Sequence, residues 1–176
     1  MDITDRFADL VRGPEDQCRV DIGAFLIAAH ARRGRGEPLD VDEQLHRLDD
    51  LAMGCPTPTL DGVCEHLFGN VGFQGDTDDY KHPRNSLLDL VLDRRRGIPI
   101  TLAVVVMEVG RRLGLDLAGV GMPGHFLVRD RDDPDAFVDP FHQQQLDRAG
   151  AEKLFAVIHG SEARFDERFL DPVGPR

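Results

Sequence analysis

The stretch that decides the fold is "RRRGIPITLAVVVMEVGRRLGL", residues 94–115. Gly97 ends one helical segment, and Pro99 suits the first turn of the next helix because its missing N–H costs nothing there. The three valines at 104–106 form helices poorly in isolation, so burial has to keep this segment helical. We therefore predict a buried central helix that starts near Pro99 and stops at Gly114.

The spacing of apolar residues is helical before the central helix and alternating after it. Upstream, apolar residues at helical spacing predict helices over 19–33, 40–53, 59–68 and 87–92, with a turn-rich loop over 69–85. Downstream, alternating residues predict strands near 117–122, 125–130 and 135–139, then a helix near 147–159 and the loose tail "FLDPVGPR" at 169–176.

This order predicts an α+β fold, in which N-terminal helices pack with a central helix and a small antiparallel sheet. At 176 residues the chain is most simply one domain, 1–176. About 1–70 is its helical N-terminal part, and about 84–160 is the core that holds the central helix and the sheet.

Composition excludes several classes of protein. A net charge of −11 argues against binding to a nucleic-acid backbone, and we interpret the arginines at 94–96 as a helix end whose cations face the negative pole of the dipole. Neither a membrane span nor a secretory leader is expected. Three cysteines, Cys18, Cys55 and Cys64, suit a reducing cytoplasm.

The candidate site combines His125, at the start of one predicted strand, with Asp139, at the end of the next. If these strands pair as a hairpin, both residues lie at its open end, where a carboxylate can hold an imidazole in one tautomer. A nucleophile at the N-terminus of the central helix would complete a triad, since that position lowers the pKa of a thiol.

Three segments carry a resemblance to a known family: "NSLLDLVLDRRRGIPITLAVVVMEVGRRLGL" at 85–115, "GVGMPGHFLVRD" at 119–130 and "FVDPF" at 137–141. The chain resembles the bacterial transglutaminase-like "core 2" family, the SirB-type proteins, over roughly residues 20–155. The resemblance implies a fold akin to transglutaminases and papain-like cysteine proteases, in which a helix N-terminus supplies cysteine and two strands supply histidine and aspartate.

The sequence departs from that pattern at the nucleophile, whose position falls on Pro99. Thr101 is the nearest hydroxyl, but two residues along a helix turn it roughly 200° away from Pro99. We therefore expect a non-catalytic binding or regulatory module with a relict His125–Asp139 pair, no cofactor, and a peptide or small molecule as its ligand. The expected cleft also includes Asn85, Arg96, Gly97, Pro99, Thr101 and Gly124.

Two alternatives stay open. In the first, the chain is a hydrolase or acyl-transferase that uses His125 as a general base with an unrecognised nucleophile or with water. In the second, His125, Asp139 and His142 hold a zinc ion, although Pro140 disfavours a helical presentation of the last two. Our prediction is that no metal is bound.

Overall fold

The computed structural model describes residues 2–175, so Met1 and Arg176, the ends of the predicted domain and tail, lie outside the described residues. Its α-helices are α1 (Ile3–Arg12), α2 (Val20–Arg33), α3 (Val41–Met53), α4 (Leu60–Cys64), α5 (Leu88–Arg94), α6 (Pro99–Arg112) and α7 (Arg148–His159). Its strands are β1 (Gln74–Gly75), β2 (Arg96–Gly97), β3 (Leu117–Val120), β4 (Leu127–Asp130), β5 (Phe137–Asp139) and β6 (Gln144–Leu146). Short helical turns are η1 (Glu15–Gln17), η2 (Glu65–Val71), η3 (Pro83–Ser86) and η4 (Glu167–Leu170).

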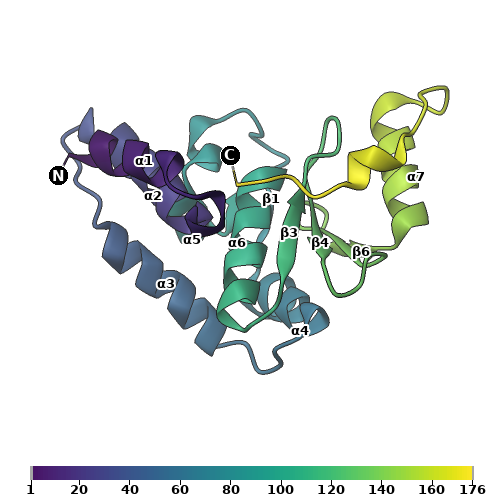
Figure 1. Cartoon of the computed structure of the whole chain (residues 1–176), viewed down its shortest axis with the longest axis horizontal. Coiled ribbons are helices and arrows are strands. Elements are labelled where there is room, and N and C mark those ends of the chain that lie inside the picture. The colour runs from purple at the N-terminus through teal and green to yellow at the C-terminus, as the bar shows by residue number, and fades with distance from the viewer. Residues whose placement is uncertain (1, 176) are drawn as a thin grey trace.

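Helix α6 is central, as the sequence predicts. It starts at Pro99 after the N-cap Ile98, and its three consecutive valines are all buried. On one side it packs against the N-terminal helices, and on the other against the antiparallel sheet β3-β4-β5-β6 (Figure 1). The predicted α+β class is confirmed.

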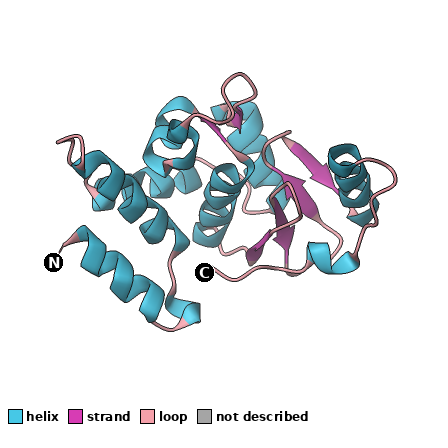
Figure 2. Ribbon diagram, turned by 90° about the horizontal axis from the view of Figure 1, so that it is seen from above, coloured by secondary structure: helices cyan, strands magenta, loops and turns pink. Residues whose placement is uncertain are grey.

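The sheet is covered on both faces, and the period-2 alternation of its strands explains how. Val128 and Val138 point into the main core with α6, whereas their neighbours Leu127 and Phe137 join a second, smaller core with Phe155 of α7. Figure 2 shows the sheet lying between α7 and the helical part of the molecule. Alternate residues of β4 and β5 therefore bind two separate helical layers together.

A buried charge cluster fixes α6 to α2. Asp21 is fully buried and accepts hydrogen bonds from Arg19 at 2.6 Å and from Arg112 at 2.9 Å. Burial alone would raise the pKa of Asp21, but these guanidinium groups outweigh it and lower the pKa to about 2. Arg112 also contacts Glu108 one turn earlier at 2.9 Å. The first helical layer is thus held to the central helix by ion pairs as well as by apolar packing.

The structure corrects several predicted boundaries. Strand β4 starts at Leu127, so His125 lies two residues before the strand rather than opening it. Helix α1 and strand β6 have no counterpart in the prediction. The tail is not loose: Leu170 is buried in the second core, and the Val173 N–H donates to the Gly119 carbonyl of β3 at 2.8 Å.

Candidate functional site

The hairpin β4–β5 brings the two predicted site residues together at its open end. His125 Nε2 lies 2.9 Å from Asp139 Oδ1, and the His125 side chain is only 6% exposed. Because Nε2 faces a carboxylate, it carries the proton of the neutral ring, which leaves Nδ1 as an unprotonated acceptor. No other described side chain or backbone group hydrogen-bonds to His125 Nδ1. The pair therefore has the geometry of a base held by its orienting acid.

Asp139 has a second imidazole partner that sequence reasoning considered only as a metal ligand. Its Oδ2 lies 2.6 Å from His142 Nδ1, and its Oδ1 also accepts from the backbone N–H groups of Phe141 and His142. Burial alone would raise the pKa of Asp139, but the hydrogen bonds from His125 and His142 outweigh it, so the pKa lies below its usual value. One ionised carboxylate thus orients two histidine rings.

Strand β1 joins this cluster to the start of α6. Gly75 pairs with Gly97 in parallel register, and the Gly75 N–H donates to the Phe141 carbonyl at 3.2 Å. A Cβ at position 75 would come within 2.6 Å of the Phe141 ring, so only glycine fits between the two. The Phe141 ring in turn meets His125 edge-on, with 6.2 Å between ring centroids. Through Gly75 the cluster is linked to the turn that precedes Pro99.

The other predicted cleft residues fall into an inner and an outer set. Asn85 is fully buried and its side chain is occupied, since it accepts from Arg94 at 2.7 Å and donates to the Asp79 carbonyl at 2.8 Å. Thr101 donates to the Asn85 carbonyl at 2.8 Å and accepts from the Ile98 N–H, so its hydroxyl turns inward. These two residues support the loop before α5 rather than line an open surface.

Arg96 and Gly124 belong to the outer set, whereas Gly97 and Pro99 are buried. The Arg96 guanidinium pairs with Asp78 at 3.0 Å on the surface. Gly124 has a φ of +75°, and a Cβ there would contact Ile158 of α7 at 3.0 Å. It therefore sets the chain direction into His125 and gives α7 room to approach.

The three candidate metal ligands do converge, in a turn rather than a helix. The ligand atoms of His125, Asp139 and His142 all lie within 4.8 Å of one another. The two rings, however, are stacked at an interplanar angle of 22° with centroids 5.5 Å apart, whereas an imidazole lone pair lies in its ring plane. The N–O distances of 2.6 and 2.9 Å are also shorter than the roughly 3.3 Å between ligands around tetrahedral zinc. The cluster is arranged for hydrogen bonding, and one ring would have to turn to bind an ion.

Two of the three cysteines are enclosed by the fold. Cys55 is buried and donates to the Thr57 carbonyl, and Cys64 is buried near Asp61. Burial, with a smaller contribution from Asp61, raises the pKa of the Cys64 thiol to about 12. At neutral pH that thiol is protonated and is not a nucleophile.

Comparison with known proteins agrees with the fold. The family model described as the transglutaminase-like superfamily matches residues 31–176. The chain belongs to the transglutaminase-like superfamily. The match includes α6 and the strands that carry the His125–Asp139 pair, and no solved structure matches the chain. No helix within residues 2–175 combines the length and apolar character that a membrane crossing requires.

Among curated proteins, this transglutaminase-like chain is similar to several of the "UPF0162" type. It is 52% identical over 115 residues to a UPF0162 protein of Xylella fastidiosa, which covers 64% of this chain and 41% of the relative. A UPF0162 protein of Haemophilus influenzae is 27% identical over 158 residues, covering 89% of this chain and 53% of the relative. F-box only protein 21 of Homo sapiens is 37% identical over 70 residues, 40% of this chain and 11% of that protein. The chain thus spans only about half or less of these relatives.

Proposed function

We propose that this chain is a non-catalytic, transglutaminase-like binding domain of the SirB type, which keeps the His125–Asp139 pair but has no nucleophile for it to activate. The observation that carries the proposal is the presence of proline at position 99. Pro99 is the first residue of α6, where the family resemblance assigns the nucleophile, and it offers neither thiol nor hydroxyl. A cytoplasmic location belongs to the same proposal, supported by three free cysteines.

The surface beside the pair suits a peptide or a small ligand. The side chain of His142 is 48% exposed while its Nδ1 is held by Asp139, so its Nε2 is available to a ligand. Tyr80 is 47% exposed and meets the Phe141 ring edge-on at 5.7 Å. An exposed aromatic ring beside an oriented imidazole provides apolar contact area and a directional hydrogen bond, as peptide-binding surfaces do.

Selection of peptides from a displayed library tests binding directly. Peptides enriched on the folded protein should lose affinity about tenfold or more when Tyr80→Ala and His142→Ala are combined, since both side chains are exposed contacts. His46→Ala, an exposed histidine on α3, is the matched control and should bind as the unaltered protein does. The proposal would be contradicted if no peptide were enriched, or if every enriched peptide bound the double variant as tightly as the unaltered protein.

A thiol placed at Pro99 tests the geometry independently of any ligand. In a Cys18→Ser background, Pro99→Cys should titrate below the ordinary thiol pKa of about 8.5, because it joins a helix N-terminus and should face the oriented imidazole. Adding His125→Gln should return the pKa toward the ordinary value. A normal titration in the single variant would show that the start of α6 does not face the pair.

A second function is favoured by one observation: His125 Nδ1 is an oriented base without a described partner. Such a base could activate water, an effect worth roughly 10²–10⁴-fold in rate. Hydrolysis of a p-nitrophenyl ester would then fall to background in His125→Gln but not in His46→Ala. Under the binding proposal, all three proteins should hydrolyse the ester at the same rate.

A further inference from the structure

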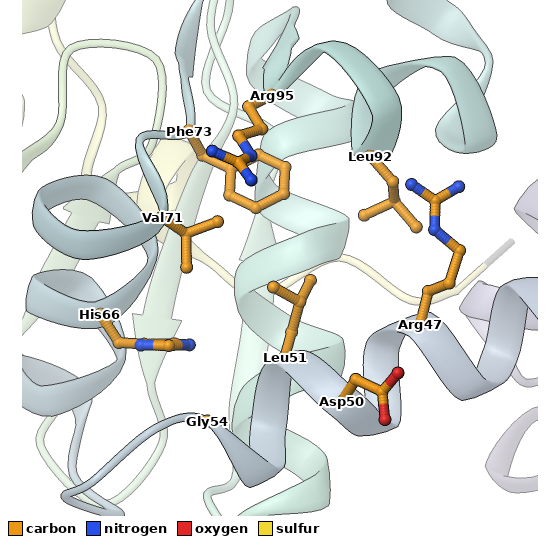
Figure 3. Close-up of a pocket in the computed structure, with 9 residues that line it drawn as sticks. All are labelled: Arg47, Asp50, Leu51, Gly54, His66, Val71, Phe73, Leu92 and Arg95. Carbon is orange, nitrogen blue, oxygen red and sulfur yellow. The ribbon is translucent and has the colours of Figure 1, made fainter.

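A second candidate site lies away from the histidine cluster, in a cavity of about 320 Å³ between α3, η2 and α5 (Figure 3). Part of its lining is apolar: Leu51 comes from α3, Val71 and Phe73 from the segment that ends η2, and Leu92 from α5. Its volume is at the lower end of the range for small-molecule sites. The walls therefore fit a compact ligand with an apolar body.

His66 is the first polar group directed into this cavity. It is 9% exposed, yet no described residue hydrogen-bonds to its ring. Figure 3 shows the ring extending from η2 toward the side of the cavity formed by α3. The His66 ring nitrogens keep access to solvent, so a ligand or water in the cavity can meet them.

Arg95 is the second such group, and it differs from both neighbours in sequence. Arg94 pairs with Asp76, and Arg96 pairs with Asp78. Among the described residues, nothing forms an ion pair or hydrogen bond with the Arg95 guanidinium. Arg95 is exposed, so its guanidinium is free to pair with an anionic ligand at the cavity.

The backbone holds Arg95 in this place at a conformational cost. Its φ of 54° puts it in the left-handed region as the C-cap of α5, a position where glycine is usual. A long side chain here is strained, and such strain gathers at ligand sites. In Figure 3 the Arg95 side chain lies at the mouth of the cavity over Phe73.

Two further charged residues, Arg47 and Asp50, line the cavity. Arg47 is partly neutralised by Asp93, at 2.8 Å, and also donates to Gln44. Asp50 is exposed, and in Figure 3 its carboxylate points away from the cavity centre. Two arginines and one aspartate line the cavity, so the charge of its lining is positive overall.

We propose that this cavity binds a small organic anion, a carboxylate with an apolar chain, whose charged end meets Arg95 and whose chain lies against Leu51 and Leu92, with His66 on the opposite wall. The site is separate from the His125 cluster and does not depend on the function proposed for it. Charge complementarity at one end and apolar walls at the other select this class over inorganic anions and over neutral or cationic amphiphiles.

The probe is octanoate, with octylamine and octanol as ligands of equal chain length but different head groups. Titration followed by NMR should show octanoate shifting the resonances of His66 and Leu51, with an affinity at least tenfold above that of octylamine. Equal affinity for the three ligands would overturn the proposal, because the arginine would then contribute no selectivity. The absence of any octanoate-induced shift would overturn it as well.

Arg95→Gly is a well-suited variant because it removes the guanidinium and relieves the positive φ, so the fold should be kept and the thermal midpoint should not fall. It should weaken octanoate binding at least tenfold, equivalent to about 1.4 kcal/mol. Arg95→Asn, which also tolerates this φ, gives a second test. Arg131→Gln, an exposed arginine elsewhere, is the charge-matched control. Unchanged affinity in both Arg95 variants would overturn the site.

Discussion

Removing the carboxylate of Asp139 provides the sharpest test of how the histidine cluster is built. In Asp139→Ala, two donors with little access to water lose their acceptor: the His125 ring N–H and the Phe141 backbone N–H. An unsatisfied buried donor costs about 1–3 kcal/mol, so the two together predict a loss of about 2–6 kcal/mol. The total free energy of unfolding of a small domain is about 5–15 kcal/mol, so this variant should be marginally folded.

Asp139→Asn separates hydrogen bonding from charge. The amide keeps one acceptor oxygen for the backbone N–H groups, and the neutral His142 ring can change tautomer to meet the amide nitrogen. We expect a smaller loss, about 1–3 kcal/mol, measured by urea denaturation at pH 7 and 25 °C. Asp132→Ala, an exposed aspartate in the β4–β5 turn, is the control and should stay within about 0.5 kcal/mol of the unaltered protein.

The pH dependence follows from the lowered pKa of Asp139. A carboxyl group whose pKa is depressed by folding contributes stability that is present above its unfolded value, about 3.9, and is lost as the pH falls through the folded value. The stability difference between the unaltered protein and Asp139→Asn should therefore be smaller at pH 3 than at pH 5. A difference that grows on acidification, or a cost below 1 kcal/mol in Asp139→Ala, would refute the arrangement described above.

Three further predictions concern the scaffold around the site. Asp21→Asn should cost about 2 kcal/mol at pH 7 and little at pH 2, because the pKa of Asp21 is lowered to about 2; urea denaturation across this pH range measures both. Leu170→Ala should cost about 2–4 kcal/mol in the same assay, since that side chain is buried in the second core. Gly75→Ala should cost about 1–3 kcal/mol, because its Cβ displaces the Phe141 ring, and it should also shift the NMR resonances of His125.

The parts of the fold that could be predicted from sequence are those whose signals are local. Pro99 marks the start of α6 because its fixed φ and missing N–H suit only the first turn of a helix. The approach of His125 to Asp139 follows from hairpin topology alone, since residues at the two ends away from the turn must be neighbours. Neither inference needs knowledge of what the rest of the chain packs against.

The missed elements depend on partners that lie far away in sequence. Strand β6, "QQL" at 144–146, has no alternating apolar pattern, and its pairing with β5 defines it. The tail reads as loose because "FLDPVGPR" has no helical or alternating apolar pattern; the second core and the edge of β3 give Leu170 and Val173 their contacts. The sequence does not indicate the hydrogen bond between His142 and Asp139, because Pro140 disfavours a helix there, whereas a turn brings the two side chains together equally well.

Asp139 and His125 differ in how far a structural role accounts for each residue. Asp139 has a structural role whatever the protein does, because its Oδ1 accepts the Phe141 and His142 N–H groups and so closes the turn after Pro140. His125 has a smaller structural role, since it adds a donor to an oxygen that the backbone already serves and packs against the rings of Phe141 and His142. The imidazole is therefore the member whose presence calls for a function. Stability measurements on Asp139 test the architecture of the cluster, and only ligand binding through the histidine rings tests what the cluster does.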